Sequence, residues 1–240
     1  MSLTKLSYAM ISGAPVNVLD YGASSSNSAA QNDTAIALAI AALGTNEELL
    51  IPQGVFNCTI CDFSNKSDFS VNIIGKLVNQ ASKPAGTNVD ARGTAGGVSP
   101  TLKFDTCTNF RVYGSGVIEN GYREAMYFTS CSNFDVNINS IGTSINDNLP
   151  GIYVRYCTDF YFSGGCANAI TKKLTTGYND WSNAFQIWDS YRFVINGLTI
   201  QNNGMNGIYS ALNCHDFAIS NNNIYSNGGS GIQIAWTGDT

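Results

Sequence analysis

Short runs of alternating apolar and polar residues recur through most of this chain. Residues 134–139 read Phe-Asp-Val-Asn-Ile-Asn, and residues 217–220 read Phe-Ala-Ile-Ser. Alternation with a period of two residues is typical of β-strands that bury one face. Several runs follow Gly or Asn, which tolerate the positive φ angles of tight corners. The pattern therefore predicts many short strands, two or three in each repeat, joined by tight corners.

Five four-residue segments share one pattern and mark the repeat. Each has Cys or Ser first, Asn, Asp or Arg third, and Phe fourth. Their phenylalanines are 24, 26, 33 and 24 residues apart. Self-similarity at a period of about 20–45 residues indicates a solenoid, because each repeat can bury its apolar face only against a neighbour. The segments are residues 107–110, 131–134, 157–160, 190–193 and 214–217.

Short strands with identical corners and no helices between them predict an all-β fold, a parallel β-helix. Its successive turns, here called rungs, would stack about 4.8 Å apart. We expect regular rungs from about residue 101, with the five phenylalanines forming a ladder inside. A β-propeller needs about 40–45 residues per blade, and a β-sandwich does not repeat one tetrapeptide through the chain. Both alternatives therefore fit less well.

One α-helix is predicted, over residues 34–43. Asn32 or Asp33 can act as its N-cap, and Gly44 ends it. Its apolar residues lie on one stripe, so the helix needs a hydrophobic surface to cover. The open end of a solenoid is such a surface, because its first rung exposes unpaired backbone groups. The stripe consists of Ile36, Ile40 and Leu43.

The seven cysteines do not suggest a disulfide framework. Four of them share one repeat position with Ser190, which indicates a small buried slot for a free thiol. Cys58 and Cys61 have the spacing of a zinc-binding pair, but no second pair or nearby His completes the site, and the alternation is typical of a strand. We therefore expect structural thiols, with no metal and no cofactor. The four column cysteines are Cys107, Cys131, Cys157 and Cys214.

Composition narrows the possible partners. Only 12% of the residues are charged and the net charge is −5, so the chain offers no basic face for nucleic acid. No apolar run approaches the roughly 20 residues that span a bilayer. The first 15 residues have one Lys and too short an apolar stretch for a signal peptide. We expect synthesis in a cytoplasm, no nucleic-acid binding and no membrane insertion.

Three segments near the N-terminus resemble the signature of pectate-lyase-like β-helix proteins. They read Val-Asn-Val-Leu-Asp-Tyr-Gly-Ala (16–23), Asn-Asp-Thr-Ala-Ile (32–36) and Leu-Ile-Pro-Gln-Gly-Val-Phe (50–56). The preceding residues 5–15 look like the lead-in of bacteriophage tailspike and tail-fibre proteins. The resemblance covers residues 5–56, and beyond them only the rung pattern agrees.

The resemblance implies a right-handed parallel β-helix over residues 16–240, with the helix at 34–43 as N-terminal cap. It also implies a homotrimer on the virion that contacts host surface polysaccharide, which some members cut. Residues 1–15 would be an arm that attaches to other phage tail proteins. The chain departs from the pattern in the Ser/Asn-rich loop after Ala23 and in having no separate head-binding domain. It also ends inside a rung, so it is either short for its class or a fragment.

Carboxylates are the groups that glycoside cleavage would require, in a pair. The candidates outside the repeated turns are Glu119, Glu124, Asp180 and Asp189. Asp135, Asp159 and Asp216 belong to repeated turns or strand faces, which favours structural roles. The single histidine, His215, occupies the second position of the repeated turn and is interpreted as a corner residue rather than a general base.

The 33-residue rung is where we expect function. Its excess falls near residues 166–184, and insertions in repeat proteins usually form surface loops on the binding face. Aromatic, amide and carboxylate side chains suit a glycan, although the same loop could pack against a neighbouring subunit of a trimer. The predicted glycan contacts are Tyr178, Asn179, Asp180 and Trp181.

Three functions fit the sequence. The first is a phage tail receptor-binding protein that attaches the virion to host polysaccharide. The second is a polysaccharide depolymerase, a glycoside hydrolase or lyase, of the same fold. The third is a structural or adaptor component of the tail. The scarcity of pairable carboxylates favours the first over the second.

Overall fold

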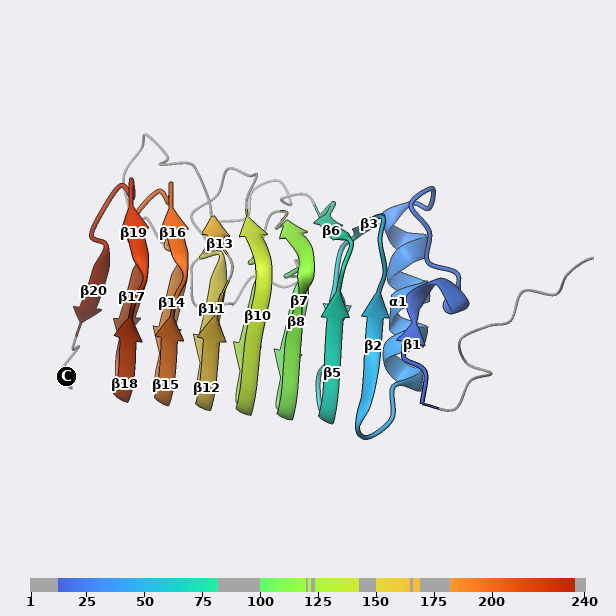
Figure 1. Cartoon of the computed structure of the whole chain (residues 1–240), viewed down its shortest axis with the longest axis horizontal. Helices are drawn as coiled ribbons and strands as arrows, with labels where there is room; N and C mark the ends of the chain where they lie inside the picture. Colours follow the sequence, from blue (N-terminus) through green and yellow to red (C-terminus); the bar gives the residue numbers. More distant parts are fainter. Residues whose placement is uncertain are drawn as a thin grey trace, which may run out of the picture.

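The computed structural model describes residues 13–81, 100–119, 121, 124–142, 150–164, 166–168 and 182–235. Its strands lie side by side in a row that starts at the helix α1 and ends at β20 (Figure 1). The chain passes along one face of the molecule after another, and each complete circuit stacks on the one before it. Residues 1–12 of the predicted arm lie outside the described residues.

The strands form three faces, and the strand pairings among the described residues are parallel. The long face comprises β1 (Val16–Asn17), β2 (Glu47–Ile51), β5 (Ser67–Ile73), β8 (Thr108–Glu119), β10 (Ser132–Gly142), β12 (Thr158–Ser163), β15 (Tyr191–Asn196) and β18 (His215–Ser220). The short face comprises β3 (Val55–Cys58), β6 (Lys76–Asn79), β13 (Cys166–Asn168), β16 (Thr199–Gln201) and β19 (Asn223–Tyr225). The second sheet comprises β4 (Cys61–Asp62), β7 (Leu102–Asp105), β9 (Met126–Thr129), β11 (Ile152–Arg155), β14 (Phe185–Trp188), β17 (Ile208–Ala211) and β20 (Ile232–Ala235).

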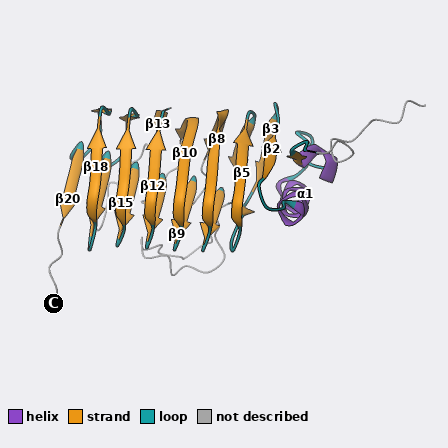
Figure 2. Ribbon diagram, turned by 60° about the horizontal axis from the view of Figure 1, so that its bottom comes forward, coloured by secondary structure: helices purple, strands orange, loops and turns teal. Residues whose placement is uncertain are grey.

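This architecture confirms the prediction of an all-β, right-handed parallel β-helix with a single α-helix. The register sets like residues opposite one another: Phe110 pairs with Phe134, and Phe134 with Phe160. The repeated tetrapeptides therefore mark the same point of successive rungs. Figure 2 shows the same row of strands with α1 packed across its first end.

The column phenylalanines stack inside the molecule, as expected. Neighbouring rings are nearly parallel, with centroids 4.9 Å apart for Phe110 and Phe134, 4.8 Å for Phe160 and Phe193, and 4.7 Å for Phe193 and Phe217. These separations match the spacing of the rungs, which a parallel register imposes on identical side chains. The stack also extends upstream to Phe69, whose centroid is 5.2 Å from that of Phe110.

The stack corrects the expected start of the regular rungs at about residue 101. Parallel pairing is continuous from β2 through β5 to β8, so the rungs are regular from residue 47 onward. Ser67-Asp68-Phe69 carries the same turn pattern as the later repeats. The long interval between Phe69 and Phe110 hid this rung from a search for one short period.

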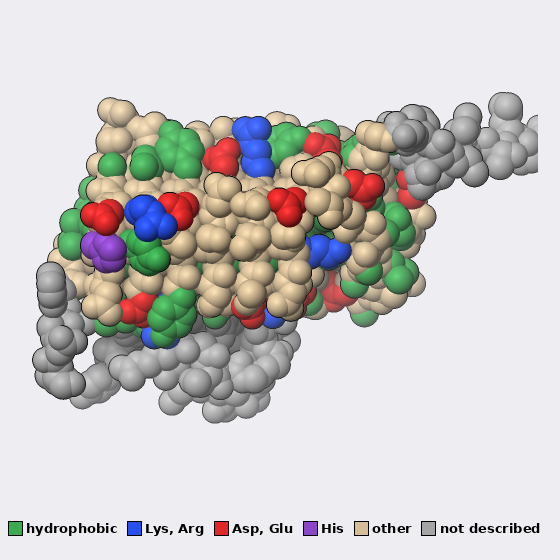
Figure 3. All heavy atoms as spheres, turned by 90° about the horizontal axis from the view of Figure 1, so that it is seen from below, with side chains coloured by type: hydrophobic (Ala, Val, Ile, Leu, Met, Phe, Trp, Pro, Cys, Tyr) green, Lys and Arg blue, Asp and Glu red, His purple; other side chains and the backbone are tan. Residues whose placement is uncertain are grey.

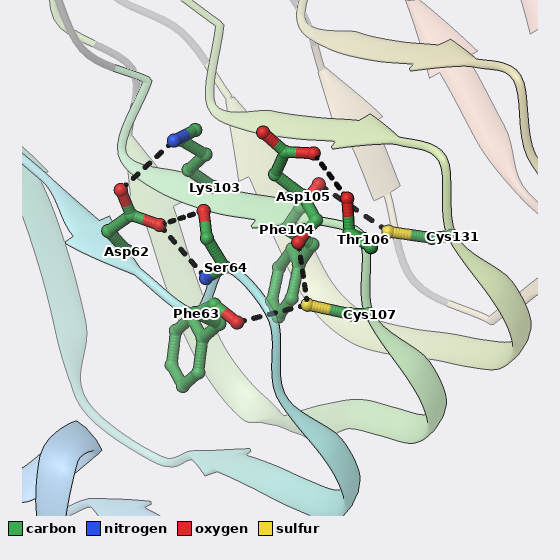
Figure 4. A network of polar contacts seen from close by, with 9 residues as sticks. All are labelled: Asp62, Phe63, Ser64, Lys103, Phe104, Asp105, Thr106, Cys107 and Cys131. Atoms are coloured by element: carbon green, nitrogen blue, oxygen red, sulfur yellow. Dashed lines mark hydrogen bonds and ion pairs between the residues drawn. The ribbon is translucent and has the colours of Figure 1, made fainter.

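The repeated Cys position is a hydrogen-bonding slot between rungs. The thiol of Cys107 donates to the carbonyl of Phe63 (3.0 Å), and that of Cys131 to the carbonyl of Phe104 (3.5 Å; Figure 4). One rung further, Cys157 Sγ accepts the backbone N–H of Cys131 (3.4 Å). A buried position that must both donate and accept suits a thiol or a hydroxyl, which explains the exchange of Cys for Ser.

Ser190 fills the slot in the next rung in the same way. Its hydroxyl accepts the backbone N–H of Cys157 (3.1 Å) and donates to the carbonyl of Trp188 (2.7 Å).

The hydrogen bond to Cys131 and burial raise the pKa of the Cys107 thiol well above its ordinary value. A protonated, buried thiol is a poor nucleophile, so these cysteines are packing groups. The expectation of structural thiols agrees with the free cysteines found among the described residues.

Cys58 and Cys61 occupy a corner instead of a single strand. Cys58 ends β3 and Cys61 begins β4, so the expected continuous strand through the pair is wrong. Within the described residues, no three His, Cys, Asp or Glu side chains are grouped to hold a metal ion. The hydrogen bond to Cys58 and burial raise the pKa of Cys61, which keeps this thiol protonated as well.

The helix α1 spans Ala29–Ala42 and begins earlier than predicted. Ser28 is its N-cap and forms a capping box with Gln31, so the predicted caps Asn32 and Asp33 lie inside the helix. Their side chains serve tertiary contacts instead: Asn32 donates to the carbonyl of Asn57 (2.9 Å). No described helix is long and apolar enough to cross a membrane.

The helix caps the first rung as expected. Its apolar stripe is buried against that rung, with Ile36 fully inaccessible. Asp33 accepts the backbone N–H of Thr59 (2.7 Å) and the Thr59 hydroxyl, which attaches the helix to the corner that follows β3. The cap therefore joins the scaffold through both apolar packing and charge-assisted hydrogen bonds.

Candidate functional site

The predicted glycan contacts cannot be placed. Tyr178, Asn179, Asp180 and Trp181 lie outside the described residues. The same holds for Asp180 as a catalytic candidate. Both assignments stay predictions.

The other catalytic candidates have different surroundings. Glu119 forms an ion pair with Lys76 (2.5 Å), and Glu124 is 1% exposed near the start of β9. Asp189 lies at the end of β14, where it binds Arg155 Nε (3.1 Å). Two of the three carboxylates therefore neutralise neighbouring cations at the surface, and the third is enclosed.

Asp189 belongs to an aromatic cluster on the second sheet. Tyr127 and Tyr153 stack with centroids 5.2 Å apart, and Trp188 meets Tyr153 edge to face at 5.8 Å. The Arg155 guanidinium lies 5.5 Å from the Trp188 ring. Because Tyr153 and Trp188 are only 3% and 6% exposed, this cluster presents little aromatic surface to a ligand.

His215 is a corner residue, as interpreted from the sequence. It begins β18, is exposed, and stacks on Tyr191 of the preceding rung with centroids 4.9 Å apart. Its Nδ1 lies 3.0 Å from Asp216 Oδ2. The position thus continues a stack of side chains along the turn.

An open groove of about 530 Å³ runs along the outside of the long face. Figure 3 shows the side of the molecule where the long-face strands begin. Small acidic and basic patches lie there among uncharged polar surface. The groove crosses β5, β8, β10, β12 and β15. Its lining consists of Phe69, Asn109, Phe110, Arg111, Asn133, Phe134, Asp135, Asp159, Phe160, Tyr161 and Arg192.

The rim of the groove comes from the residue that precedes each phenylalanine. Asn109, Asn133, Asp159 and Arg192 all have φ between 52° and 56°, in the left-handed region. Asn and Asp adopt this region more easily than other residues with side chains. The residues that close each turn therefore also provide a row of polar side chains, here called the turn column: Asp68, Asn109, Asn133, Asp159, Arg192 and Asp216.

Side chains of the turn column bond to one another across rungs. Asn133 Nδ2 donates to Asn109 Oδ1 (2.8 Å), and Asn109 Nδ2 donates to Asp68 Oδ1 (3.0 Å). Further along, Arg192 binds Asp159 through two nitrogens, Nε at 2.6 Å and Nη2 at 2.7 Å. These bonds fix the orientations of the rim side chains before any ligand arrives.

A second ion pair lies beside the rim on the outward side of the strands. Arg111 Nε is 3.1 Å from Asp135 Oδ2, and its guanidinium lies over the Tyr113 ring at 4.8 Å. The Tyr113 hydroxyl donates to Glu48, which raises the pKa of Tyr113. Tyr161, on the neighbouring strand, is the exposed aromatic side chain of the groove lining.

The groove brings together two carboxylates that sequence reasoning treated as structural. Asp135 pairs with Tyr161 in register, so Asp159 lies one rung and two residues away. Glycoside hydrolysis requires a pair of carboxyl groups, one of which acts as an acid. The hydrogen bonds from Arg192, however, lower the pKa of Asp159 to about 2. An acid catalyst needs a raised pKa, so the arrangement suits recognition better than hydrolysis.

Sequence reasoning missed this groove although the residues that form it were in the aligned repeats. The third position of the tetrapeptides reads Asn, Asn, Asp, Arg, Asp, and an Asp followed one rung later by an Arg predicts a cross-rung ion pair. The outward direction of these side chains depends on their left-handed φ, which the alternation rule does not contain.

No family model matches the sequence, and no curated protein matches it either. Several solved β-helix structures are similar. The A-module of the mannuronan C-5 epimerase AlgE6 from Azotobacter vinelandii has 13% identity and a TM-score of 0.43, covering 91% of this chain and 79% of the other. An exopolygalacturonase from Thermotoga maritima has 14% identity and a TM-score of 0.34, covering 91% and 74%.

The product of ORF18 of Geobacillus virus E2 is also similar, with 10% identity and a TM-score of 0.28. The match covers 94% of this chain and 62% of the other. The likeness to all three is one of fold and carries no argument about activity.

Proposed function

We propose that the protein is a receptor-binding protein of a bacteriophage tail that attaches the virion to polysaccharide on the host surface. The observation that carries the proposal is the preorganised polar groove on the long face. The resemblance of residues 5–56 to tailspike and tail-fibre lead-ins supports the phage setting.

The groove is suited to binding because its side chains are already fixed. Cross-rung hydrogen bonds and ion pairs hold Asn109, Asn133 and Arg192, so little side-chain entropy is lost on association. Tyr161 receives a hydrogen bond from Asn196 Nδ2 (3.1 Å) and provides an apolar ring surface beside the polar rim. Amide, guanidinium and aromatic groups together match the polar edges and apolar faces of sugar rings.

We further propose that the working form is a homotrimer on the virion and that residues 1–15 attach it to other tail proteins. Three copies would present three grooves, and linked sites raise avidity without any new contact. Analytical ultracentrifugation of the full chain tests this assembly. A monomer at micromolar concentration would contradict the trimer and leave the groove proposal standing.

Binding is tested with fluorescently labelled protein on host cells to which the virion adsorbs. Periodate treatment of the cells, which cleaves vicinal diols of sugars, should abolish binding, whereas protease treatment should not. Saturable binding that survives periodate would refute a polysaccharide receptor. Release of soluble oligosaccharides during the incubation would instead favour the depolymerase, which is the second candidate. Failure to bind cells, with retention on tail particles, would favour the structural component.

A matched pair of variants tests whether the groove is the site. Tyr161 and Tyr225 are both exposed strand tyrosines, at 36% and 44%, but only Tyr161 lines the groove. Tyr161→Ala should weaken cell binding about tenfold or more, as truncating an aromatic anchor commonly does. Tyr225→Ala should leave it unchanged. Equal effects of the two substitutions would show that binding takes place elsewhere.

A further inference from the structure

The formal charges of the groove cancel. Its charged lining residues are two arginines, Arg111 and Arg192, and two aspartates, Asp135 and Asp159. Each arginine is paired with one of the aspartates. A ligand therefore meets no surplus positive charge in the groove, and the chain as a whole carries a net charge of −5.

Three of the five N–H donors of the Arg192 guanidinium are engaged by neighbouring side chains. Nε and Nη2 bind Asp159, and Nη2 also donates to Thr158 Oγ1 (2.8 Å). The plane of the group lies over the Tyr191 ring at 4.6 Å. A sugar carboxylate could form the same bidentate pair only by displacing Asp159, and the bidentate pair is the strong geometry for such bonds.

The other polar groups of the groove also disfavour the carboxylate of an acidic ligand. Asp135 Oδ2 binds Arg111, but Oδ1 has no hydrogen-bond partner, so part of its negative charge is not compensated. The amide groups of Asn109 and Asn133 each donate one of their two N–H bonds, to Asp68 and to Asn109, which leaves each an N–H for a ligand. Hydroxyl groups can use such amides as donors and acceptors without bringing charge.

We infer that the groove takes an uncharged, hydroxyl-rich polysaccharide and rejects acidic polymers. The inference rests on the proposed function, because it names the class of glycan for the same site. The paired arginines are the reason for the rejection, because Asp135 and Asp159 already neutralise their positive charge. Releasing one of them should therefore change the preference of the groove.

Asp159→Asn releases Arg192 at little structural risk. Asn already occupies the same left-handed position at Asn109 and Asn133, and Asp159 is on the surface. Asp216→Asn is the matched control, because Asp216 belongs to the turn column but does not line the groove. Both variants remove one negative charge, so a general change in net charge affects them equally.

Binding is measured by saturation-transfer NMR and calorimetry. The neutral probes are dextran, mannan and galactan, and the acidic probes are polymannuronate and polygalacturonate. Wild-type protein should bind at least one neutral polymer with an affinity that salt does not change. Asp159→Asn should gain about tenfold or more in affinity for acidic polymers, and salt should weaken this binding, whereas Asp216→Asn should gain nothing.

Two results would overturn the inference in different ways. Wild-type binding to acidic polymers alone, lost in Tyr161→Ala, would refute the neutral class and keep the groove as the glycan site. Binding to no polymer of either kind, by wild type or variant, would refute both the inference and the proposed function.

Discussion

The internal phenylalanine stack should carry a large share of the stability of the β-helix, and Phe134 contacts the rings of four other phenylalanines. Phe134 is 4% exposed. It stacks on Phe110 and Phe128 with centroids 4.9 Å away, and on Phe160 at 5.1 Å. Truncation to Ala removes these contacts and leaves a cavity that the rigid rungs cannot close.

The expected loss follows from the burial. A buried Phe→Ala change costs about 3–5 kcal/mol in folding free energy. Phe217 is the control, because it is only half-buried and, within the described residues, its ring stacks on Phe193 alone. Phe217→Ala should therefore cost about 1–2 kcal/mol, roughly half of full burial. Phe134→Leu keeps most of the apolar volume and loses the ring contacts, each worth about 0.5–1.5 kcal/mol.

Urea unfolding followed by circular dichroism measures these differences. We expect the order of stability to be wild type, then Phe134→Leu and Phe217→Ala, then Phe134→Ala. Unchanged m-values would show that the variants differ in stability and not in the surface exposed on unfolding. If Phe134→Leu is as stable as wild type, stacking adds nothing to apolar burial. If Phe134→Ala costs no more than Phe217→Ala, the stack does not hold the central rungs together.

Three further predictions concern the turns. Cys157→Ser should change stability by less than about 1 kcal/mol in urea unfolding, because Ser190 makes the same bonds, whereas Cys157→Ala should cost about 1–3 kcal/mol by leaving a buried N–H unpaired. Gly116→Ala should cost at least about 1–3 kcal/mol, because its Cβ would lie 2.2 Å from a backbone oxygen; unchanged urea unfolding would contradict this contact. The pKa of Asp159 is lowered in the folded protein, so its ion pair with Arg192 stabilises the fold fully above about pH 4. This stabilisation is lost as the pH falls through about 2. Acid-unfolding curves of Asp159→Asn and wild type should therefore converge only in that range.

The fold was predictable because its repeats use the same side chains for the same contacts. The Cys and Phe positions identified the register of the later rungs, since a parallel stack places like residues opposite one another. Phe69 was missed because its interval to Phe110 exceeds the period. The helix start was missed because Ser28 and Gln31 form the cap, while Asn32 and Asp33, which look like caps, bind the corner after β3.

The candidate groove was less predictable than the fold. Alternation assigns each strand residue to the inside or the outside, but a residue with positive φ leaves that alternation. Asn109, Asn133 and Asp159 therefore seemed to be corner residues only. Their side chains reach the surface in a row because every rung closes with the same backbone conformation. The groove thus depends on the residue types of the turns, which a sequence shows, and on the direction in which their side chains point, which a sequence does not show.

Arg192 is the member of the turn column that turn chemistry does not explain. Its φ is 52°, and a left-handed conformation costs residues with side chains about 1–2 kcal/mol unless they are Asn or Asp. Its ion pair with Asp159 is exposed, and exposed ion pairs contribute little to stability. The pair therefore does not fully offset the strain, which motivates a test for a second role of the arginine at this position.

Arg192→Asn tests whether that role is ligand binding. Asn fits the backbone at this position, as Asn109 and Asn133 do. The variant should be as stable as wild type or more stable by up to about 1 kcal/mol in urea unfolding, because relief of strain outweighs loss of an exposed ion pair. Cell binding should fall, because the groove loses a fixed donor group beside Tyr161. A variant that is clearly less stable than wild type and binds cells normally would make Arg192 a structural residue. If the strained arginine serves a ligand, the variant should instead keep or gain stability and bind cells more weakly.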